Sequence, residues 1–332
     1  MNKVNLDIDS SHNLLGFSAG VDSTALFFLM IEQNIPFDIA IVDYNQRVQS
    51  KDEVIYATQL AHKFNKKCFI SNFPKDLKFS EKSARDFRHN FFEKIIKENS
   101  YDALITAHQL NDKLEWFLMQ LTKGAGVTEL LGMEEISYKN NYKVLKPMLS
   151  YSKQALKNYL DTKNIKYFID ESNKDEKYKR NYFRHNFSDK LLEEFESGIS
   201  KSFQYLQNDV DSLIDNIKVE RFEQLHIYKF NNDMNLAIRV IDKDLKKRGI
   251  IISKATRDEI KLQKDIVVSH KIAVSIQDSK IWIAPSVKNS MDKKFKERCR
   301  VNKIPQNIRA YLSTLDDTLL STFFLSQISE VE

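Results

Sequence analysis

The chain contains the stretch Leu14-Leu15-Gly16-Phe17-Ser18-Ala19-Gly20-Val21-Asp22-Ser23-Thr24, which predicts the fold of its first half. The apolar run at 14–17 is typical of a short buried strand, and the apolar run at 25–31 is typical of a buried helix. The small residues between the two runs therefore form a strand-to-helix turn. Backbone N–H groups in such a turn, aided by the positive end of the new helix, can bind phosphate. Hydroxyl groups of Ser23 and Thr24 can add donors, and Asp22 can hold a metal or position a nucleophile.

The turn differs from two common phosphate-binding patterns. It has no Gly-Lys-Ser/Thr, so it is not a P-loop, and it lacks the glycines of a dinucleotide fingerprint. It resembles the Ser-Gly-Gly-x-Asp-Ser loop of the PP-loop ATP pyrophosphatases, which bind ATP, adenylate a carbonyl oxygen and release pyrophosphate. The resemblance implies nucleotide contacts for Ser18, Ala19, Gly20, Val21, Asp22 and Ser23. Ala19 replaces that family's first glycine, and we expect it to have a negative φ, because a methyl group opposes a positive one.

The following 150 residues alternate between strand and helix patterns. Strands are predicted at 37–43, 67–71, 103–107 and 142–146, and helices at 54–64, 80–97, 111–122 and 153–162. This alternation predicts parallel βαβ units with right-handed crossovers, in which a ligand lies beyond the carboxyl ends of the strands. Ser18, Asp43 and His108 fall at such strand ends. We assign no acid–base role to His108, although it could contact a ribose or a phosphate.

Two further groups of charged residues have spacings that suit phosphate chemistry. Asp112 and Glu115 lie on one face of a first helical turn, and with Asp22 they could hold Mg²⁺ through carboxylate oxygens. The alternative is that they complement the helix dipole. Arginine pairs with helical spacing can grip phosphate in a bidentate manner, and the alternative for each pair is a surface salt-bridge face. These pairs are Arg85 with Arg88 and Arg180 with Arg184.

Spaced segments beyond the turn resemble a narrower family, tRNA(Ile)-lysidine synthetase. They are Val42-Asp43-Tyr44-Asn45-Gln46-Arg47, Ala84-Arg85-Asp86-Phe87-Arg88, Ala107-His108 with Asp112 and Glu115, Lys123-Gly124-Ala125-Gly126, Leu131-Gly132-Met133, Asp170-Glu171-Ser172-Asn173 and Arg180-Asn181-Tyr182-Phe183-Arg184. Tyr44 replaces the usual histidine of the first segment. The match covers roughly 14–192. The resemblance implies an α/β, parallel-sheet PP-loop ATPase domain of the adenine nucleotide alpha hydrolase-like type.

The resemblance also implies a reaction and its substrates. ATP adenylates the C2 carbonyl oxygen of wobble cytidine 34 in a tRNA(Ile) with a CAU anticodon, and the ε-amine of free L-lysine then displaces AMP. The product, lysidine, changes codon reading from AUG to AUA. The implied catalytic residues are Asp22, Asp112, Glu115 and Arg184. The metal ligands for Mg²⁺ would be Asp22, Asp112 and Glu115. The implied nucleotide-binding residues include the loop 18–23 with Asp43, Arg85, Arg88 and His108.

Two alternatives stay open on the sequence. A tRNA thiolase of the same superfamily also adenylates a base carbonyl, but such enzymes usually need cysteines near the site. This chain has two cysteines, Cys68 and Cys299, far apart in sequence. The second alternative is an inactive nucleotide- or RNA-binding relative, for which Ala19 and Tyr44 are the indications. Intact Asp22, Ser23, Asp112 and Glu115 argue against it.

Length, charge and hydropathy predict the remaining organisation. A chain of 332 residues has room for two domains, which we place at 1–215 and 216–332. We expect the second to be a smaller, largely helical, tRNA-binding domain with a β-hairpin turning at Asp278-Ser279. The segment 243–303 has 17 Lys/Arg against 7 Asp/Glu, which suits a polyanion such as RNA, although solvated lysine is the alternative. The first residues lack a signal-peptide core and no run is apolar enough to span a membrane, so we expect a cytoplasmic protein. The sequence also allows a homodimer.

Overall fold

The computed structural model describes residues 6, 8, 11–45, 49–139, 141–169, 179–215 and 217–328. The chain divides into two compact units, Met1–Gln207 and Asn208–Glu332. The division falls inside the long helix α8 (Asp189–Asp215), slightly before the boundary expected after residue 215. Each unit is described by itself.

The first unit is built on a six-stranded sheet with the strand order β3-β2-β1-β4-β6-β5. Neighbouring strands are parallel except for β5, which runs antiparallel to β6. The strands are β1 (Asn13–Gly16), β2 (Phe37–Asp43), β3 (Cys68–Asn72), β4 (Ala103–Ile105), β5 (Ile136–Lys139) and β6 (Tyr142–Leu145). The five predicted parallel strands are confirmed, and β5 is an addition that its exposed, polar sequence did not indicate.

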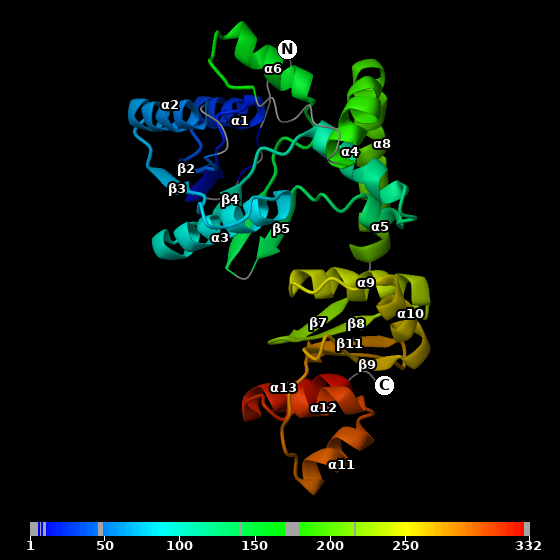
Figure 1. Cartoon of the computed structure of the whole chain (residues 1–332). Helices are drawn as coiled ribbons and strands as arrows, with labels where there is room; N and C mark the ends of the chain where they lie inside the picture. Colours follow the sequence, from blue (N-terminus) through cyan, green and yellow to red (C-terminus); the bar gives the residue numbers. More distant parts are fainter. Residues whose placement is uncertain are drawn as a thin grey trace. The chain divides into compact units, whose positions relative to one another are not determined.

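Helices cover both faces of this sheet, because its central strands are apolar on both sides. The helices are α1 (Val21–Glu32), α2 (Gln49–Lys63), α3 (Glu81–Asn99), α4 (Leu110–Leu121), α5 (Val127–Leu130), α6 (Lys153–Thr162) and α7 (Lys179–Phe183), followed by a π-helix η2 (Arg184–Ser188) and α8. Leu15 of β1 faces a core shared with α1, α2 and α6, whereas Leu14 faces the core under α3. Figure 1 shows α1 and α2 on one side of the sheet and α3 on the other.

Local sequence explains where several of these helices begin. Ser80 caps α3 by accepting a hydrogen bond from the backbone N–H of Ser83. Ser152 caps α6 in the same way through the N–H of Ala155. In the first unit, the chain passes from β1 into α1, from β4 into α4 and from β6 into α6. These three helices begin beyond the carboxyl ends of parallel strands, where the predicted site residues lie.

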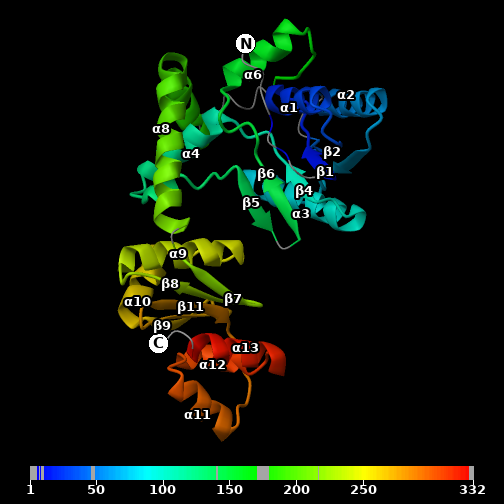
Figure 2. The same cartoon turned by 180° about the vertical axis from the view of Figure 1, so that it is seen from behind.

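The second unit has a five-stranded antiparallel sheet with the order β7-β8-β11-β10-β9. Its strands are β7 (Val219–Phe222), β8 (Leu225–Lys229), β9 (Asp265–Val268), β10 (Ile272–Gln277) and β11 (Lys280–Pro285). Its helices are α9 (Met234–Lys247), α10 (Lys254–Gln263), α11 (Lys293–Val301), α12 (Gln306–Leu312) and α13 (Asp317–Ile328). One core joins α9 and α10 to the sheet, and another joins α11, α12 and α13 to its opposite face, as the view from behind also shows (Figure 2).

The expected β-hairpin of the second unit is confirmed as β10–β11. Gln277 pairs with Lys280, and both turn residues, Asp278 and Ser279, have a positive φ. This backbone geometry is typical of two-residue hairpin turns. The helices are as expected, but the hairpin lies inside a complete sheet, of which β7, β8 and β9 were not predicted. Among the described residues, no helix is both long and apolar enough to cross a membrane.

Candidate active site

The loop between β1 and α1 is held closed by its two serines. The Ser18 N–H donates to Ser23 Oγ at 3.2 Å, and the two hydroxyl oxygens lie 3.0 Å apart. The Ser23 hydroxyl is also 3.3 Å from the carbonyl oxygen of Gly20, which is the N-cap of α1 and has no side chain to satisfy the helix N–H groups. The first turn of α1, beginning at Val21, therefore presents backbone N–H groups that a bound anion can satisfy.

Ala19 lies in the left-handed region with φ of 59°, so the expectation of a negative φ is wrong. This conformation costs an L-residue about 1–2 kcal/mol. The surroundings enforce it, because Ala19 is completely buried and its carbonyl oxygen accepts a hydrogen bond of 2.9 Å from the Phe168 N–H. The loop thus keeps the backbone path that glycine allows at this position, but under strain.

The carboxyl group of Asp22 has a strongly raised pKa. Burial, together with the nearby charges of Asp112 and Glu115, raises its pKa to about 7, although Lys153 and Arg184 oppose the shift. Its Oδ1 atom is buried and has no hydrogen-bond partner among the described residues, and the same holds for Thr24 Oγ1 two positions later. Unsatisfied buried oxygens are expensive, so this part of the site suits a cation or a donor supplied by a ligand.

Asp112 and Glu115 of α4 are engaged by two arginines. Arg180 donates from Nε to Glu115 Oε2 at 2.7 Å and from Nη2 to Asp112 Oδ1. Arg184 donates from Nε to Glu115 Oε1 at 2.6 Å and from Nη2 to Oε2 at 3.1 Å. Burial alone would lower the pKa of Arg180, but the two carboxylates raise it. The structure therefore brings together the predicted residues Asp22, Asp112, Glu115 and Arg184, and adds Arg180.

Two local devices position this cluster. Asp112 belongs to a capping box, in which its Oδ2 accepts the backbone N–H of Gln109 at 3.0 Å. Asp112 therefore stabilises the start of α4, as the alternative interpretation of the sequence proposed, and also contacts Arg180. Arg184 begins the π-helix η2, a rare form that often marks functional sites.

Within the part of the chain that the structure describes, the arrangement fits a magnesium ion only at Asp22. Among the described residues, no group of three His, Cys, Asp or Glu side chains is placed to hold a metal. The expected trio does not form a ready-made site, because guanidinium groups occupy both oxygens of Glu115 and Oδ1 of Asp112, while Oδ2 of Asp112 caps its helix. The free Oδ1 of Asp22 is the donor that a hard cation would use.

The remaining predicted nucleotide-binding residues lie at neighbouring strand ends and on α3. Asp43 ends β2 and accepts the Asn45 N–H at 2.8 Å. Arg88 hydrogen-bonds to Tyr44. Arg85 pairs with Glu81 at 3.2 Å and keeps 54% of its side chain exposed, so it lies at the rim rather than inside the cluster.

His108 is half-buried and stays neutral near pH 7. Burial and the cationic groups of Lys146, Arg180 and Arg88 lower its pKa to about 4, against the opposing effect of Asp112. One ring nitrogen lies 3.0 Å from Thr106 Oγ1. These observations agree with assigning His108 no acid–base role.

Sequence reasoning missed two residues that shape the site. Lys153 is the first residue of α6, and its charge lowers the pKa of Asp22. Asn111 is buried and connects elements, because it accepts the Lys153 N–H at 3.1 Å and donates to Asp189 at 2.8 Å. The signal for Lys153 was its place at the start of a helix that follows a parallel strand.

The glycine-rich segment after α4 is fixed by Trp116. The indole Nε1–H donates to the Glu129 carbonyl oxygen at 3.0 Å. A Cβ at Gly132 would lie 3.1 Å from that indole nitrogen and 3.2 Å from the same carbonyl, so a side chain there would require the indole or the loop to shift by a few tenths of an ångström. Trp116 thus anchors the loop, although 37% of the residue is exposed.

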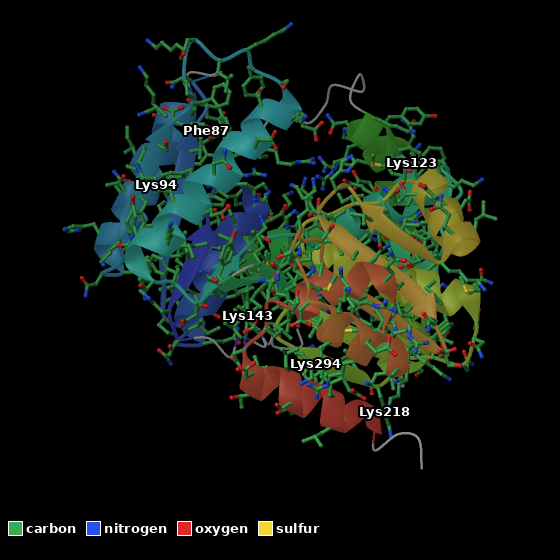
Figure 3. The ribbon with its side chains drawn as sticks, turned by 90° about the horizontal axis from the view of Figure 1, so that it is seen from below. Phe87, Lys94, Lys123, Lys143, Lys218 and Lys294 are labelled. Atoms are coloured by element: carbon green, nitrogen blue, oxygen red, sulfur yellow. The ribbon has the colours of Figure 1, made fainter. Side chains whose placement is uncertain are left out.

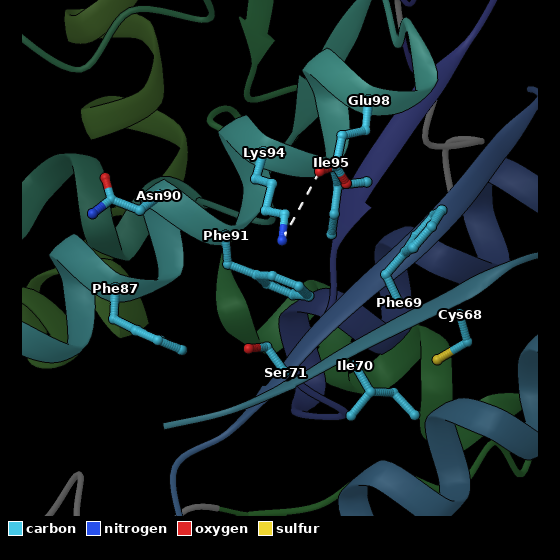
Figure 4. Close-up of a pocket in the computed structure, with 10 residues that line it drawn as sticks. All are labelled: Cys68, Phe69, Ile70, Ser71, Phe87, Asn90, Phe91, Lys94, Ile95 and Glu98. Carbon is cyan, nitrogen blue, oxygen red and sulfur yellow. Dashed lines mark ion pairs between the residues drawn. The ribbon is translucent and has the colours of Figure 1, made fainter. Parts of the chain in front are cut away.

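A hollow of about 650 Å³ lies between β3 and α3. Figure 4 shows its wall of Phe69, Ile70 and Phe91, with the Lys94–Glu98 ion pair on α3. Phe87 and Lys94 are also labelled along that helix in Figure 3. None of the predicted site residues lines this hollow.

Comparison with known proteins agrees with this geometry. Residues 1–191 match the PP-loop domain family. A protein of Campylobacter jejuni strain RM1221 named tRNA(Ile)-lysidine synthase is 44% identical over 301 residues, covering 90% of this chain and 92% of the relative. This chain belongs to the tRNA(Ile)-lysidine synthase family. Members named in the same way from Helicobacter hepaticus and Helicobacter pylori strain 26695 are 41% and 40% identical, covering 92% and 90% of this chain.

The segments that resemble the tRNA(Ile)-lysidine synthase family lie partly at the active-site cluster. Asp112, Glu115, Arg180 and Arg184 form the cluster, and the charges of Asp112 and Arg180 act on His108. The segments 46–47 and 170–173 lie outside the described residues. Among solved structures, a U34-tRNA thiolase from Methanococcus maripaludis is similar with a TM-score of 0.47 and 15% identity, covering 63% of this chain and 74% of the thiolase.

Proposed function

We propose that this protein ligates free L-lysine to C2 of cytidine 34 in the CAU anticodon of tRNA(Ile), with ATP as the activating substrate. Family membership supports the reaction, and one observation carries the proposal for the site. Asp22, with an unpartnered buried oxygen, lies in the nucleotide loop beside the Asp112–Glu115–Arg180–Arg184 cluster. A triphosphate acceptor, a cation position and anion-binding side chains therefore meet at the carboxyl ends of the strands.

The reaction balances in two steps. The cytidine O2 attacks the α-phosphorus of ATP, an O–P bond forms, and pyrophosphate leaves. The ε-amine of lysine then attacks C2, a C–N bond forms, and the C2–O bond breaks to release AMP with the original O2 atom. The amine loses a proton to the site or to water. The sum converts ATP, lysine and cytidine into lysidine, AMP and pyrophosphate.

The loop 18–23 would bind the phosphates through the N–H groups of α1 and the hydroxyl of Ser23. Its fixed backbone would hold the α-phosphorus in line for attack, which removes much of the entropic cost of the first step. Asp43 at the end of β2, with His108 at the end of β4, would border the nucleoside.

Mg²⁺ would supply charge neutralisation on the departing pyrophosphate when bound, with Asp22 as its direct protein ligand. The wider prediction that Asp112 and Glu115 also bind the ion stays a prediction, and it requires Arg180 and Arg184 to release them. With its pKa raised to about 7, Asp22 can accept a proton near neutral pH when no cation holds it.

The arginines would stabilise charge on the triphosphate. Arg184 and Arg180 are already fixed by Glu115, so they need little reorganisation to meet an anion. Arg88 faces Tyr44 beside the end of β2, and Arg85 lies at the rim, where a transient contact with phosphate would replace its Glu81 partner.

The second unit would bind the body of the tRNA, and the reaction would take place in the cytoplasm, where ATP, lysine and tRNA occur together. A homodimer stays a prediction that sedimentation of the full chain with and without tRNA would test.

The test is AMP release from a tRNA(Ile) transcript with a CAU anticodon. We expect release to require both lysine and the CAU transcript, with lysidine detected by mass spectrometry of the digested RNA. The matched control is the same transcript with GAU in the anticodon. Release of AMP without lysine, or with sulfur incorporated instead, would contradict the proposal and favour the thiolase alternative.

A further inference from the structure

We propose that the second unit contains a discrete pocket for one backbone phosphate of RNA, formed by Arg221, Lys243 and Lys247. This inference rests on the proposed function in one respect, which is that the RNA is a tRNA.

The pocket lies between the edge strand β7, its neighbour β8, and α9, and has a volume of about 210 Å³. Arg221 comes from β7, opposite His226 of β8, and Val219 lies opposite Tyr228. On α9, Val240, Lys243 and Lys247 share one face because they follow the i, i+3, i+7 spacing. At ~30 Å³ per water, the space is that of several water molecules, which suits a phosphate group better than a nucleotide.

Charge distinguishes these three cations from their neighbours. Among the described residues, Arg221, Lys243 and Lys247 have no carboxylate within ion-pair distance. By contrast, Lys246 pairs with Asp242 at 2.6 Å, and Arg248 pairs with Asp244. The basic stretch at 246–248 therefore contains two structural cations and one free one, Lys247.

The acid in the pocket does not cancel this positive charge. Asp244 is 2% exposed, and it accepts hydrogen bonds from His226, from Tyr228 at 2.6 Å and from Arg248. Its oxygens are thus satisfied within the unit. Three cations around a partly apolar floor of Val219 and Val240 then leave an excess positive charge in a recess, where water screens a bound anion less than on an open surface.

A phosphodiester is the anion that the arrangement favours. An arginine on a strand and lysines on a facing helix can approach one phosphate from two sides, and arginine can do so with two parallel hydrogen bonds. Contacts of this kind position RNA without reading its sequence. An acidic protein segment is the competing ligand, and the test below separates the two.

The experiment compares two triple variants of the full chain. The pocket variant is Arg221→Gln, Lys243→Gln and Lys247→Gln. The control is Lys293→Gln, Lys294→Gln and Lys296→Gln, which removes the same charge from exposed positions on α11 in the same unit. We expect the pocket variant to bind tRNA about tenfold more weakly, as loss of one charge-assisted contact predicts. The slope of log K against log salt should fall by about 1. The control should change both much less.

Equal effects of the two triple variants, or unchanged tRNA affinity in the pocket variant, would overturn the pocket. If the triple pocket variant melts early, Lys247→Gln alone replaces it, because that side chain is exposed and unpaired. Lysidine formation by the unaltered protein is measured in parallel. If the pocket variant binds tRNA more weakly but the unaltered protein forms no lysidine, the pocket is supported and the proposed function is refuted. If the unaltered protein forms lysidine but the pocket variant binds tRNA normally, the proposed function is supported and the pocket is refuted.

Discussion

Arg184 holds Glu115 through both carboxylate oxygens, with hydrogen bonds of 2.6 and 3.1 Å to a side chain that is completely buried. A buried carboxylate is tolerated only when its charge is matched and its lone pairs are used. Arg180 adds a second guanidinium to the same group. The cluster is therefore a rigid arrangement in which removing any one charge leaves another buried without compensation.

Glu115→Gln should consequently destabilise the protein as well as inactivate it. Breaking a buried ion pair costs roughly 3–5 kcal/mol, and glutamine keeps the shape and one acceptor, so we expect the lower end of that range. Urea denaturation and pyrophosphate release measure the two effects. The matched control is Glu98→Gln, which removes only an exposed pair of 3.9 Å and should cost at most ~1 kcal/mol. Equal stability of the two variants would contradict a buried network.

Asp22→Asn should abolish adenylation and make stability less dependent on pH. The pKa of Asp22 is raised from 3.8 to about 7, so the folded state holds this proton more tightly than the unfolded state. Stability from this group is fully present below about pH 4 and is lost as the pH rises through 7. The full difference amounts to about 4 kcal/mol, of which about 2–3 kcal/mol falls between pH 5 and pH 8. Comparing unfolding of the wild type and the asparagine variant at pH 5 and pH 8 isolates it. A constant difference between them would show that Asp22 is not perturbed.

Ala19→Gly should be nearly neutral, whereas Ala19→Val should be severely disruptive. Glycine relieves about 1–2 kcal/mol of left-handed strain. It also loses a buried methyl, about 0.8 kcal/mol, and adds ~0.5–1 kcal/mol of chain entropy to the unfolded state. Valine keeps the strained φ of 59° and is β-branched. We expect melting temperatures close to wild type for glycine, with full ATP-dependent activity, and a clear loss for valine. A glycine variant that loses activity would mean that the methyl itself is required.

Removing both cysteines should leave lysidine formation intact. Cys68 lies on the edge strand β3 of the first unit and Cys299 on α11 of the second, and both are free thiols. Alanine is the better substitute at 299, because a serine hydroxyl buried there would need a hydrogen-bond partner that the thiol does not need. The measurement is lysine-dependent AMP release by Cys68→Ala with Cys299→Ala. Loss of activity in a folded double variant would revive the thiolase alternative.

The strand-to-helix turns were predictable because local pattern and topology agree at these positions. Apolar runs of four to seven residues end at Ser18, Asp43 and His108, and parallel strands must direct those ends to one edge of the sheet. The polar and charged residues that follow these strands therefore lie at the same edge of the sheet, however the helices pack around it.

The contacts among those residues could not be predicted in the same way. Nothing in the spacing of Asp112 and Glu115 separates a metal site from an arginine-bound pair, since the partners at 180 and 184 are supplied by tertiary packing. The positive φ of Ala19 likewise follows from its burial and from Phe168, not from its own preference. In the second unit, short strands with exposed edges, such as 219–222, carry too little periodicity to be recognised.

The bridge between Gly20 and Phe168, with the hydrogen bond from the Phe168 N–H to Ala19, joins the nucleotide loop to a segment far along the chain. A movement of the Ala19 carbonyl on triphosphate binding must either break that bond or carry Phe168 with it. Occupancy of the loop and the position of Phe168 are therefore coupled, and by reciprocity a change that holds Phe168 elsewhere alters the affinity of the loop for a triphosphate.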